Sequence, residues 1–307
     1  MKILMVGHSR SGKTSYMSGL YHLYGDDPKG FGLWMSNSSK KANLKRLGDQ
    51  ISNGRYPSGT DISSVYNFWL QYDNELLIPF DWYDYRGGAL SETSNISKDA
   101  QALVSQISTA DALIVFLDGE KITKMTDDDL EEEYDVLIWA IQKSISNRAS
   151  KGHYFPISFV ITKGDLYSTY DPLYGSAGLN YFMPIITTIR ESQVAAGMIG
   201  VVEVSMEGIH NVFAPLIFSL YYGMHHYEEE RIRNAKEEIE KYKNLYPNIF
   251  DDIWSAFWGK DSDRAKARKC IDNYNEEIEK LKTLDSLSEV MNKMLEMFCE
   301  KNMIIKF

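Results

Sequence analysis

The sequence predicts an α/β protein built on a doubly wound, mostly parallel sheet. A short apolar run at 2–6 leads straight into a glycine loop, and a helical pattern follows. Apolar runs then alternate with amphipathic segments as far as residue 224, which is typical of parallel strands joined by helices. The runs at 112–118 and 157–162 are apolar almost throughout, as expected of strands covered on both faces.

The individual elements follow in order from the spacing of apolar residues. After the first strand, 15–24 is expected to be a helix with Met17, Leu20 and Tyr24 on one face, and 37–51 contains a second helical pattern. The runs 65–70 and 75–83 are expected to be strands joined by a turn at 73–74. Further strands are expected at 112–118, 157–162 and 198–205, and further helices at 98–108, 127–144, 181–196 and 211–224.

Composition and charge exclude several classes of protein. The chain has 307 residues with 44% hydrophobic and 25% charged residues, which is ordinary for a globular protein. Its net charge of −10 argues against a general nucleic-acid binder, so no nucleic-acid partner is expected. Cys270 and Cys299 have no neighbouring Cys/His cluster, so neither a zinc site nor a disulfide framework is predicted.

Location is predicted from what the sequence does not contain. The apolar run at the N-terminus is too short for a signal peptide, and no stretch approaches the ~18–20 apolar residues of a membrane span. Sparse cysteine fits a reducing compartment. The expected location is therefore cytoplasmic, without a transmembrane segment.

The segment 7–14, Gly-His-Ser-Arg-Ser-Gly-Lys-Thr, matches the P-loop pattern G-x-x-x-x-G-K-[ST]. The two glycines allow the backbone to come close to phosphate oxygens, and the loop N–H groups with the start of the next helix form an anion site. Lys13 is expected to reach the β- and γ-phosphates, and the Thr14 hydroxyl to ligate Mg²⁺. The predicted phosphate-binding residues are Gly7, Ser9, Ser11, Gly12, Lys13, Thr14 and Ser15.

Polar groups at the ends of the other expected strands add to this site, because ligands of such sheets bind at the carboxyl ends of the strands. Asp84 can hold Mg²⁺ through water, and the Gly87 N–H can meet a γ-phosphate. Thr60, in the long loop before the second strand, can complete the Mg²⁺ shell. Each group alone is a weak signal, since an Asp-x-x-Gly is a plain turn more often than not.

The Thr162-Lys163-Gly164-Asp165 segment indicates which base is bound. Asp165 can accept the paired N1–H and N2–H donors of guanine, which adenine lacks, and the Lys163 stem can pack flat on the base. Ser205, after the last expected strand, can present a backbone N–H to the guanine O6. The order and placement of these groups together predict guanine nucleotides, GTP or GDP, with Mg²⁺.

On these motifs, residues 1–224 resemble a P-loop GTPase domain of the translation-factor/Ras-like (TRAFAC) class. The matching segments are 7–14, 84–87 and 162–165, and the pieces 56–60 and 208–223 resemble the bacterial double-GTPase branch. The resemblance implies the P-loop GTPase fold, Mg²⁺-dependent GTP binding, and slow hydrolysis switched by partners.

One departure from the family pattern bears on hydrolysis. Many members place a water-orienting Gln directly after the Asp-x-x-Gly, where this chain has Gly88, and Thr162 replaces the usual Asn of the fourth motif. Hydrolysis is therefore expected to be slow or to use another group. The candidates for that group are Arg10, Arg86 and His8, or a residue supplied by a partner or by a second copy of the chain. Lys13 is expected to assist hydrolysis as well, through its contact with the phosphates.

The segment 225–307 changes character and is expected to form an α-helical hairpin appended to the 1–224 domain. Apolar residues spaced 3, 4, 3 recur in 227–245 and in 264–284, and 287–298 is a further amphipathic helix. The connection at 249–258 carries Trp254 and Trp258. Either these aromatics dock a protein partner or a membrane surface, or the hairpin folds back and buries them. Acidic neighbours favour a protein partner over anionic lipid.

The sequence thus predicts a GTP-binding protein that acts as a Mg²⁺-dependent GTPase switch with a partner-recruiting helical appendage. Two alternatives remain open. The first is a GTP-dependent interaction module that does not hydrolyse, which Gly88 favours. The second is an ATP-using P-loop enzyme, against which the 162–165 segment speaks.

Overall fold

The computed structural model describes residues 1–25, 30–57, 63–85, 98–149, 154–166, 177–192, 194–224, 237, 240, 287–301 and 303–307. The chain divides into two compact units, Met1–Gly223 with Lys293–Phe307, and Met224–Asn292. The observed division differs from the expected one, 1–224 and 225–307, at the C-terminal end, because the last fifteen residues belong with the first unit. The predicted hairpin segments 227–245 and 264–284 and the aromatic connection 249–258 lie outside the described residues, apart from Glu237 and Glu240, which are helical.

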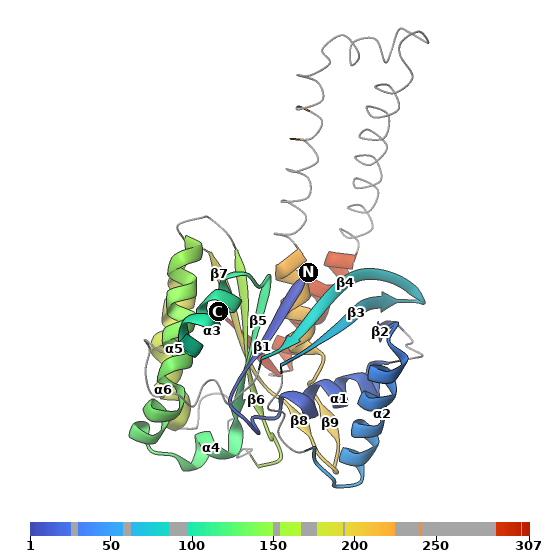
Figure 1. The fold of residues 1–307 in the computed structure, drawn as a ribbon, viewed down its shortest axis with the longest axis horizontal. Coiled ribbons are helices and arrows are strands. Elements are labelled where there is room, and N and C mark those ends of the chain that lie inside the picture. The colour runs from blue at the N-terminus through green and yellow to red at the C-terminus, as the bar shows by residue number, and fades with distance from the viewer. Residues whose placement is uncertain are drawn as a thin grey trace. The chain divides into compact units, whose positions relative to one another are not determined.

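The first unit is an α/β sandwich around an eight-stranded sheet with the order β10-β7-β6-β5-β1-β4-β3-β2 (Figure 1). Strands β4, β1, β5, β6 and β7 run parallel, whereas β2 and β3 at one edge and β10 at the other are antiparallel to their neighbours. The strands are β1 Lys2–Val6, β2 Phe31–Trp34, β3 Ser64–Tyr72, β4 Glu75–Asp84, β5 Ala112–Asp118, β6 Phe155–Thr162, β7 Ala195–Val201 and β10 Ile304–Lys306. A separate hairpin pairs β8 Glu203–Val204 with β9 Ile209–His210.

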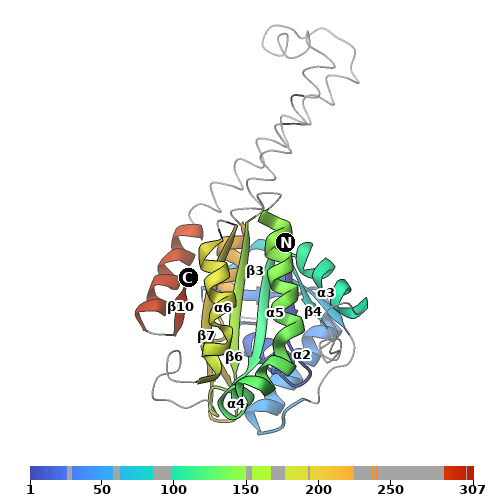
Figure 2. The same ribbon diagram turned by 90° about the vertical axis from the view of Figure 1, so that its left-hand side faces the viewer.

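Helices cover both faces of the sheet. Figure 2 looks onto the face covered by α3, α5 and α6, and there Leu103, Leu137 and Ile185 belong to one buried apolar cluster. On the other face α1 packs through Tyr16, whose ring meets Trp82 of β4 and Phe116 of β5 at centroid distances of 5.9 and 5.1 Å. The helices are α1 Lys13–Tyr24, α2 Ser38–Ser52, α3 Lys98–Ser108, α4 Gly119–Lys124, α5 Asp127–Ala149, α6 Ala177–Glu191 and the segments 214–224 and 287–300.

Most of the expected elements are confirmed, and the 112–118 strand and the 98–108 helix agree in both bounds. The turn at 73–74 is confirmed as well, since Asp73 and Asn74 have φ of 46° and 70° and join β3 to β4 as a two-residue hairpin loop. Four short elements were not predicted: β2, of four residues, α4, of six, β9, of two, and β10, of three. All four are too short to show a period in the sequence.

The expectations around residues 181–224 need correction. The helix predicted to reach 196 ends at Glu191, because Ala195 and Ala196 start β7 beside β6. The strand predicted at 198–205 stops at Val201, and it is not the last one. The helix predicted from 211 begins at 214, because Asn211 adopts φ of 58° and its side-chain amide donates to the Val201 and Met303 carbonyls at 2.8 and 2.7 Å.

The C-terminal strand explains two of these boundaries. β10 pairs antiparallel with β7, and the N–H groups of Gly197 and Phe307 each donate to the other's carbonyl at 2.8 Å. A side chain at Gly197 would lie within 2.1 Å of the Phe307 ring, so glycine is required there by close packing. Pairing with a strand from the far end of the chain thus overrides the helix propensity of the two alanines before Gly197.

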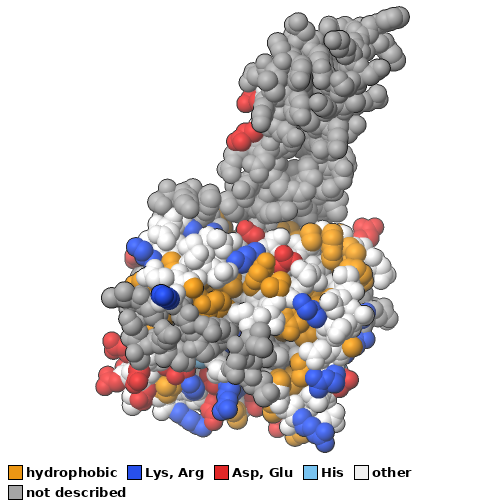
Figure 3. All heavy atoms as spheres, in the orientation of Figure 1, with side chains coloured by type: hydrophobic (Ala, Val, Ile, Leu, Met, Phe, Trp, Pro, Cys, Tyr) orange, Lys and Arg blue, Asp and Glu red, His pale blue; other side chains and the backbone are white. Residues whose placement is uncertain are grey.

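Charge is distributed unevenly over the first unit. The acidic side chains of Asp127, Asp128 and Asp129 are exposed where α5 begins, and α2 exposes Lys45 and Arg46. The space-filling view shows acidic atoms gathered at the lower left and basic ones at the lower right (Figure 3). Carboxylates in the first turn of α5 also interact favourably with the helix dipole. In the part of the chain that the structure describes, no helix is long and apolar enough to cross a membrane.

A buried arginine joins two helices on the α3/α5/α6 face, and it gives a prediction about stability. The Arg148 guanidinium of α5 donates to the carbonyls of Ile107, Ser108 and Ala110 at the end of α3 and stacks 4.0 Å from the Phe155 ring centroid. Arg148→Met should lower the free energy of unfolding by about 2–4 kcal/mol, because buried carbonyls lose their donor. Urea denaturation measures this.

The matched control is Arg190→Met at the exposed end of α6, which should change the free energy of unfolding by less than about 0.5 kcal/mol. Equal effects of the two substitutions would contradict the assigned role of Arg148.

Candidate functional site

The loop between β1 and α1 has the geometry of a phosphate cradle. Gly12 precedes the helix with φ of 86°, a left-handed conformation that side chains rarely adopt, and the helix starts directly at Lys13. The Lys13 ammonium folds back over the loop and donates to the carbonyls of Gly7 and His8 at 2.6 and 2.9 Å. The loop N–H groups and the positive end of α1 thus converge with a fixed cation, which is the arrangement that anionic phosphates require.

Thr162 fastens this loop to the end of β6. Its hydroxyl lies 2.9 Å from the Ser11 carbonyl and 3.1 Å from the Leu117 carbonyl, so it can donate to either. A Cβ added to Gly12 would lie 3.0 Å from the Thr162 side chain, which is tighter than ordinary packing, and the left-handed φ adds strain for any other residue. The phosphate loop and the segment that starts at Thr162 are therefore in direct contact.

Lys13 and Asp84 form a buried pair of opposite charges beneath the loop. Both side chains are almost completely buried. Burial lowers the pKa of Lys13 and raises the pKa of Asp84 to about 6, and in each case the other group's charge opposes the shift. Among the described residues, the Asp84 Oδ1 atom is buried without a hydrogen-bond partner, which suits a carboxylate that binds a further ligand.

These residues fit the Mg²⁺ expectation. The described part of the chain contains no group of three or more His, Cys, Asp or Glu that could hold a metal by itself. Mg²⁺ bound with nucleotides usually takes one or two protein oxygens and fills its octahedron with phosphate oxygens and waters. Two protein oxygens of this kind are present: the hydroxyl of Thr14, half-buried at the start of α1, and the Asp84 Oδ1 atom.

A cavity of about 530 Å³ opens beside the loop and extends to the 162–166 segment. Its volume is in the range of small-molecule and cofactor sites. Its lining combines phosphate-loop residues with residues from the ends of β6, β7 and α2. They are Ser9, Arg10, Ser11, Gly12, Lys13, Thr14, Ser15, Tyr16, Tyr56, Pro57, Glu120, Thr162, Lys163, Asp165, Leu166, Val202 and Val204.

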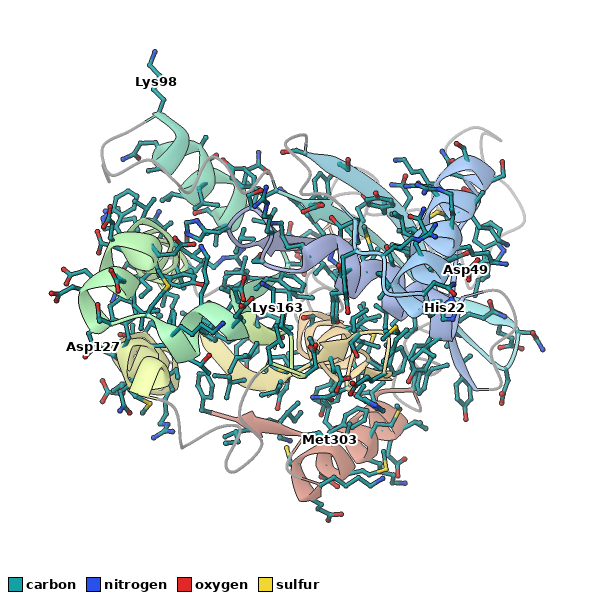
Figure 4. The ribbon with its side chains drawn as sticks, turned by 90° about the horizontal axis from the view of Figure 1, so that it is seen from below. His22, Asp49, Lys98, Asp127, Lys163 and Met303 are labelled. Carbon is teal, nitrogen blue, oxygen red and sulfur yellow. The ribbon has the colours of Figure 1, made fainter. Side chains whose placement is uncertain are left out.

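Lys163 also lines the cavity and has an unusual conformation. Its φ of 55° is left-handed, which is uncommon for a residue other than glycine. Its ammonium donates to Asp118 Oδ2 at 2.7 Å and to Glu120 Oε2 at 3.3 Å. Figure 4, seen from below, shows Lys163 near the centre of the view. Asp165, two residues later, is exposed and lines the same cavity.

Two predicted side chains do not reach the cavity. Ser205 is buried in the β8–β9 turn, where its N–H donates to the Gly208 carbonyl at 2.9 Å and its hydroxyl donates to Glu203 at 2.7 Å. The Ser205 N–H is therefore occupied, and the structure does not favour its predicted contact with guanine. His8 is likewise turned inward, packed edge-on against Tyr134 and 3.6 Å from Glu133, so it is no candidate for hydrolysis.

The remaining predicted residues divide into two groups. Arg10 is exposed, has φ of 65° and lines the cavity, whereas Gly7 is buried beneath the loop. Thr60, Arg86, Gly87 and Gly88 lie outside the described residues. The contact of Gly87 with the γ-phosphate, the contact of Thr60 with Mg²⁺ and the role of Arg86 in hydrolysis thus stay predictions from the sequence.

Several residues that line the cavity, and Asp118, which bonds the lining residue Lys163, carried no sequence signal. Asp118 ends a strand that was read only as apolar, and Glu120 starts a helix too short to predict. Val202 and Val204 reach the cavity because the backbone turns between β7 and β8, where the Gly164 N–H donates to the Val202 carbonyl at 3.0 Å. An acidic residue at the end of a buried strand, beside the Thr162–Asp165 segment, was the signal that could have identified Asp118.

No protein-family model and no curated protein sequence matches the chain. Solved structures do match. A signal recognition particle receptor SRb-GTP/SRX complex from Chaetomium thermophilum matches at 14% identity over 67% of this chain and 92% of that one, with a TM-score of 0.42. The GTP-bound Ski7 GTPase-like domain of S. cerevisiae matches at 14% identity over 67% and 42%, with a TM-score of 0.39.

A GDP-bound NFeoB variant from S. thermophilus matches at 12% identity over 96% of this chain and 98% of that one, with a TM-score of 0.34. Two of these matches are named as a GTP complex and a GTPase-like domain bound to GTP, and the third as bound to GDP. At such identities and TM-scores, the likeness supports no conclusion about what this chain does.

Asp84 gives a prediction about pH. Its pKa of about 6 lies above the ordinary value of 3.8, so between pH 4 and 6 the folded protein holds a proton that the unfolded chain has released. In nucleotide-free and Mg²⁺-free protein, stability should therefore fall as the pH rises through this window, by on the order of 2 kcal/mol from this group. Urea denaturation across the window measures it.

Asp84→Asn, which cannot ionise, should remove this fall in stability, while the exposed Asp127→Asn should leave it in place. A wild-type profile that instead rises across the window and is unchanged by Asp84→Asn would contradict the assignment.

Proposed function

We propose that this chain is a Mg²⁺-dependent GTP-binding switch that hydrolyses GTP slowly. The observation that carries the proposal is the junction at Thr162, which joins the phosphate loop and the Lys163–Asp165 segment into one cavity. The lining combines a fixed cation and the loop N–H groups with the exposed carboxylate of Asp165. That combination of charges suits a ligand that carries phosphates and a base with paired N–H donors.

The roles of the residues follow from their positions. Lys13 and the loop N–H groups hold the β- and γ-phosphates, and Thr14 and Asp84 hold Mg²⁺, directly and through water. Mg²⁺ supplies positive charge that neutralises the phosphate oxygens. Asp165 accepts from the N1–H and N2–H of guanine, and Lys163 lays its stem along the base. Thr60 and Gly87 complete the shell around Mg²⁺ and the γ-phosphate, as the sequence predicts.

Among the described residues, Arg10 is a better candidate than His8 for the group that assists GTP hydrolysis. Arg10 is exposed on the phosphate loop and lines the cavity, while His8 is buried against Tyr134. An arginine placed on the transition state contributes ~10³–10⁵ in rate. Arg86, next to the predicted γ-phosphate contact, is the second candidate, and Gly88 supplies no side chain to orient water.

The segment that follows residue 224 is proposed to recruit a protein partner. Support comes from the sequence alone: two charge-rich segments with 3, 4, 3 apolar spacing flank the aromatic connection at 249–258. A membrane surface is the less favoured ligand of that connection, because Asp251 and Asp252 would be repelled by anionic lipid.

Base selectivity tests the guanine assignment. Displacement of labelled GDP should require about a hundredfold more ATP than GTP, because adenine offers no paired N–H donors to Asp165. Asp165→Ala should weaken GDP binding by about tenfold or more and bring it close to ADP. Lys13→Ala should instead weaken guanine and adenine nucleotides alike, since it acts on the phosphates. Fluorescence competition measures the affinities for GTP, GDP, ATP and ADP.

Asp127→Ala, which removes an exposed carboxylate on α5, is the matched control and should leave binding unchanged. The guanine assignment fails if ATP displaces GDP as well as GTP does, and an ATP-using P-loop enzyme then becomes the better description.

Single-turnover hydrolysis tests the arginine. Arg10→Asn should slow GTP cleavage by at least about tenfold while GTP affinity changes little, because the arginine acts on the transition state. Asparagine is chosen because it tolerates the left-handed backbone at this position. Arg86→Ala, assayed in parallel, should show the larger loss if that arginine supplies the charge.

Unchanged rates in both variants would exclude an intrinsic arginine. A wild type that binds GTP but shows no cleavage in a single turnover would establish the non-hydrolysing interaction module instead.

A further inference from the structure

The end of the cavity assigned to the base has a wall whose position is set by an ion pair. Lys163 belongs to the lining, and its ammonium is held by Asp118 Oδ2 at 2.7 Å and by Glu120 Oε2 at 3.3 Å. A free lysine side chain has four rotatable bonds and loses much entropy when it is fixed. Here both ends of the stem are held, by the strand end on one side and by the carboxylates on the other.

Asp118 is itself rigidly placed. The residue is 4% exposed, it ends β5, and its Oδ1 accepts from the N–H groups of Glu120 and Lys121 at 3.1 and 3.4 Å. It therefore caps α4 with one oxygen and holds Lys163 with the other. Glu120 differs, because its side chain is solvent-exposed and is shared with Lys124 at 2.8 Å.

The phosphate end of the cavity does not depend on this pair. The Lys13 ammonium is held by the carbonyls of Gly7 and His8, and the carboxylate that influences its pKa is Asp84. Asp118 and Lys163 thus form a second charged unit within the site, fixed through different elements. The effect of a substitution at Asp118 or Lys163 on base binding can therefore be measured separately from its effect on phosphate binding.

We propose that Asp118 is a positioning residue for the purine base: it fixes the Lys163 stem in place as a flat wall before the base arrives. This proposal rests on the guanine-nucleotide binding proposed above. If the Lys163 stem is already ordered, no side-chain entropy is lost when the base packs on it. Preorganisation therefore increases the affinity for the base. Glu120 contributes less, because an exposed ion pair is weak and screened.

Asp118→Asn tests the proposal with little risk to the fold. Asparagine caps helices as well as aspartate does, so the cap on α4 is kept while the ion pair to Lys163 is lost. For the full-length protein with Mg²⁺, GDP affinity should fall by about tenfold, which corresponds to about 1.4 kcal/mol. Affinity for pyrophosphate, which has no base, should stay unchanged. Isothermal titration calorimetry measures both.

Two further single variants and one double variant make the test specific. Glu120→Gln should lower the GDP affinity less than Asp118→Asn does, because the ion pair between Glu120 and Lys163 is partly exposed. Lys163→Met keeps an apolar stem without its anchor, so it should lower GDP affinity about as much as Asp118→Asn, and the double variant should lose no more than either single one. If Asp118→Asn does not fold, Lys163→Met carries the comparison of GDP with pyrophosphate.

The outcomes separate this proposal from the proposed function. If the wild type binds GDP no more tightly than pyrophosphate, the guanine-nucleotide function fails and the role of Asp118 fails with it. If the wild type prefers GDP and Asp118→Asn keeps that preference, only the positioning role is overturned. Equal losses for GDP and pyrophosphate would also overturn it, since they would show a general structural effect.

Discussion

The site depends on one close contact, between Gly12 of the phosphate loop and Thr162 at the end of β6. A Cβ at Gly12 would lie only 3.0 Å from the Thr162 side chain, and the Thr162 hydroxyl meets the carbonyl of Ser11 in the same loop. A contact between residues 150 positions apart in the sequence thereby joins two segments that line one cavity. The glycine of the motif is needed here as much for this contact as for its left-handed φ of 86°.

The charged groups around that contact are arranged as two separate pairs. The buried Lys13 lies near Asp84 under the phosphate loop, and the half-buried Lys163 is bonded to Asp118. A buried charge without a partner would be costly, and the carboxylate beside each cation favours its ionised form. Asp84 differs from Asp118 in keeping one buried oxygen without a hydrogen bond in the described chain. The first pair is therefore suited to take a further ligand, while the second is satisfied within the protein.

The sequence predicted what is local and periodic. The phosphate loop has its own spacing, β5 is a continuous apolar run, and α3 shows a clear helical period, so all three could be placed without the structure. Contacts between distant segments could not be predicted. Asp118 shows no motif, and its role appears only when β5 and β6 lie side by side and bring it next to Lys163. Ser205 shows the opposite case: its position at the end of an expected strand suggested a contact with guanine, whereas in the structure its N–H donates to the Gly208 carbonyl within the β8–β9 turn.

The C-terminal residues change how the chain should be divided. A boundary at residue 224 looked natural because the sequence becomes charge-rich there, yet β10 pairs with β7, and Leu295 from the preceding helix is completely buried. The segment Met224–Asn292 is thus inserted into the first unit instead of being appended to it. Gly197 supports the same conclusion, since its missing side chain makes room for the Phe307 ring. A chain ending at 224 would leave one side of β7 unpaired, so the sheet that carries the site requires residues from both sides of the inserted unit.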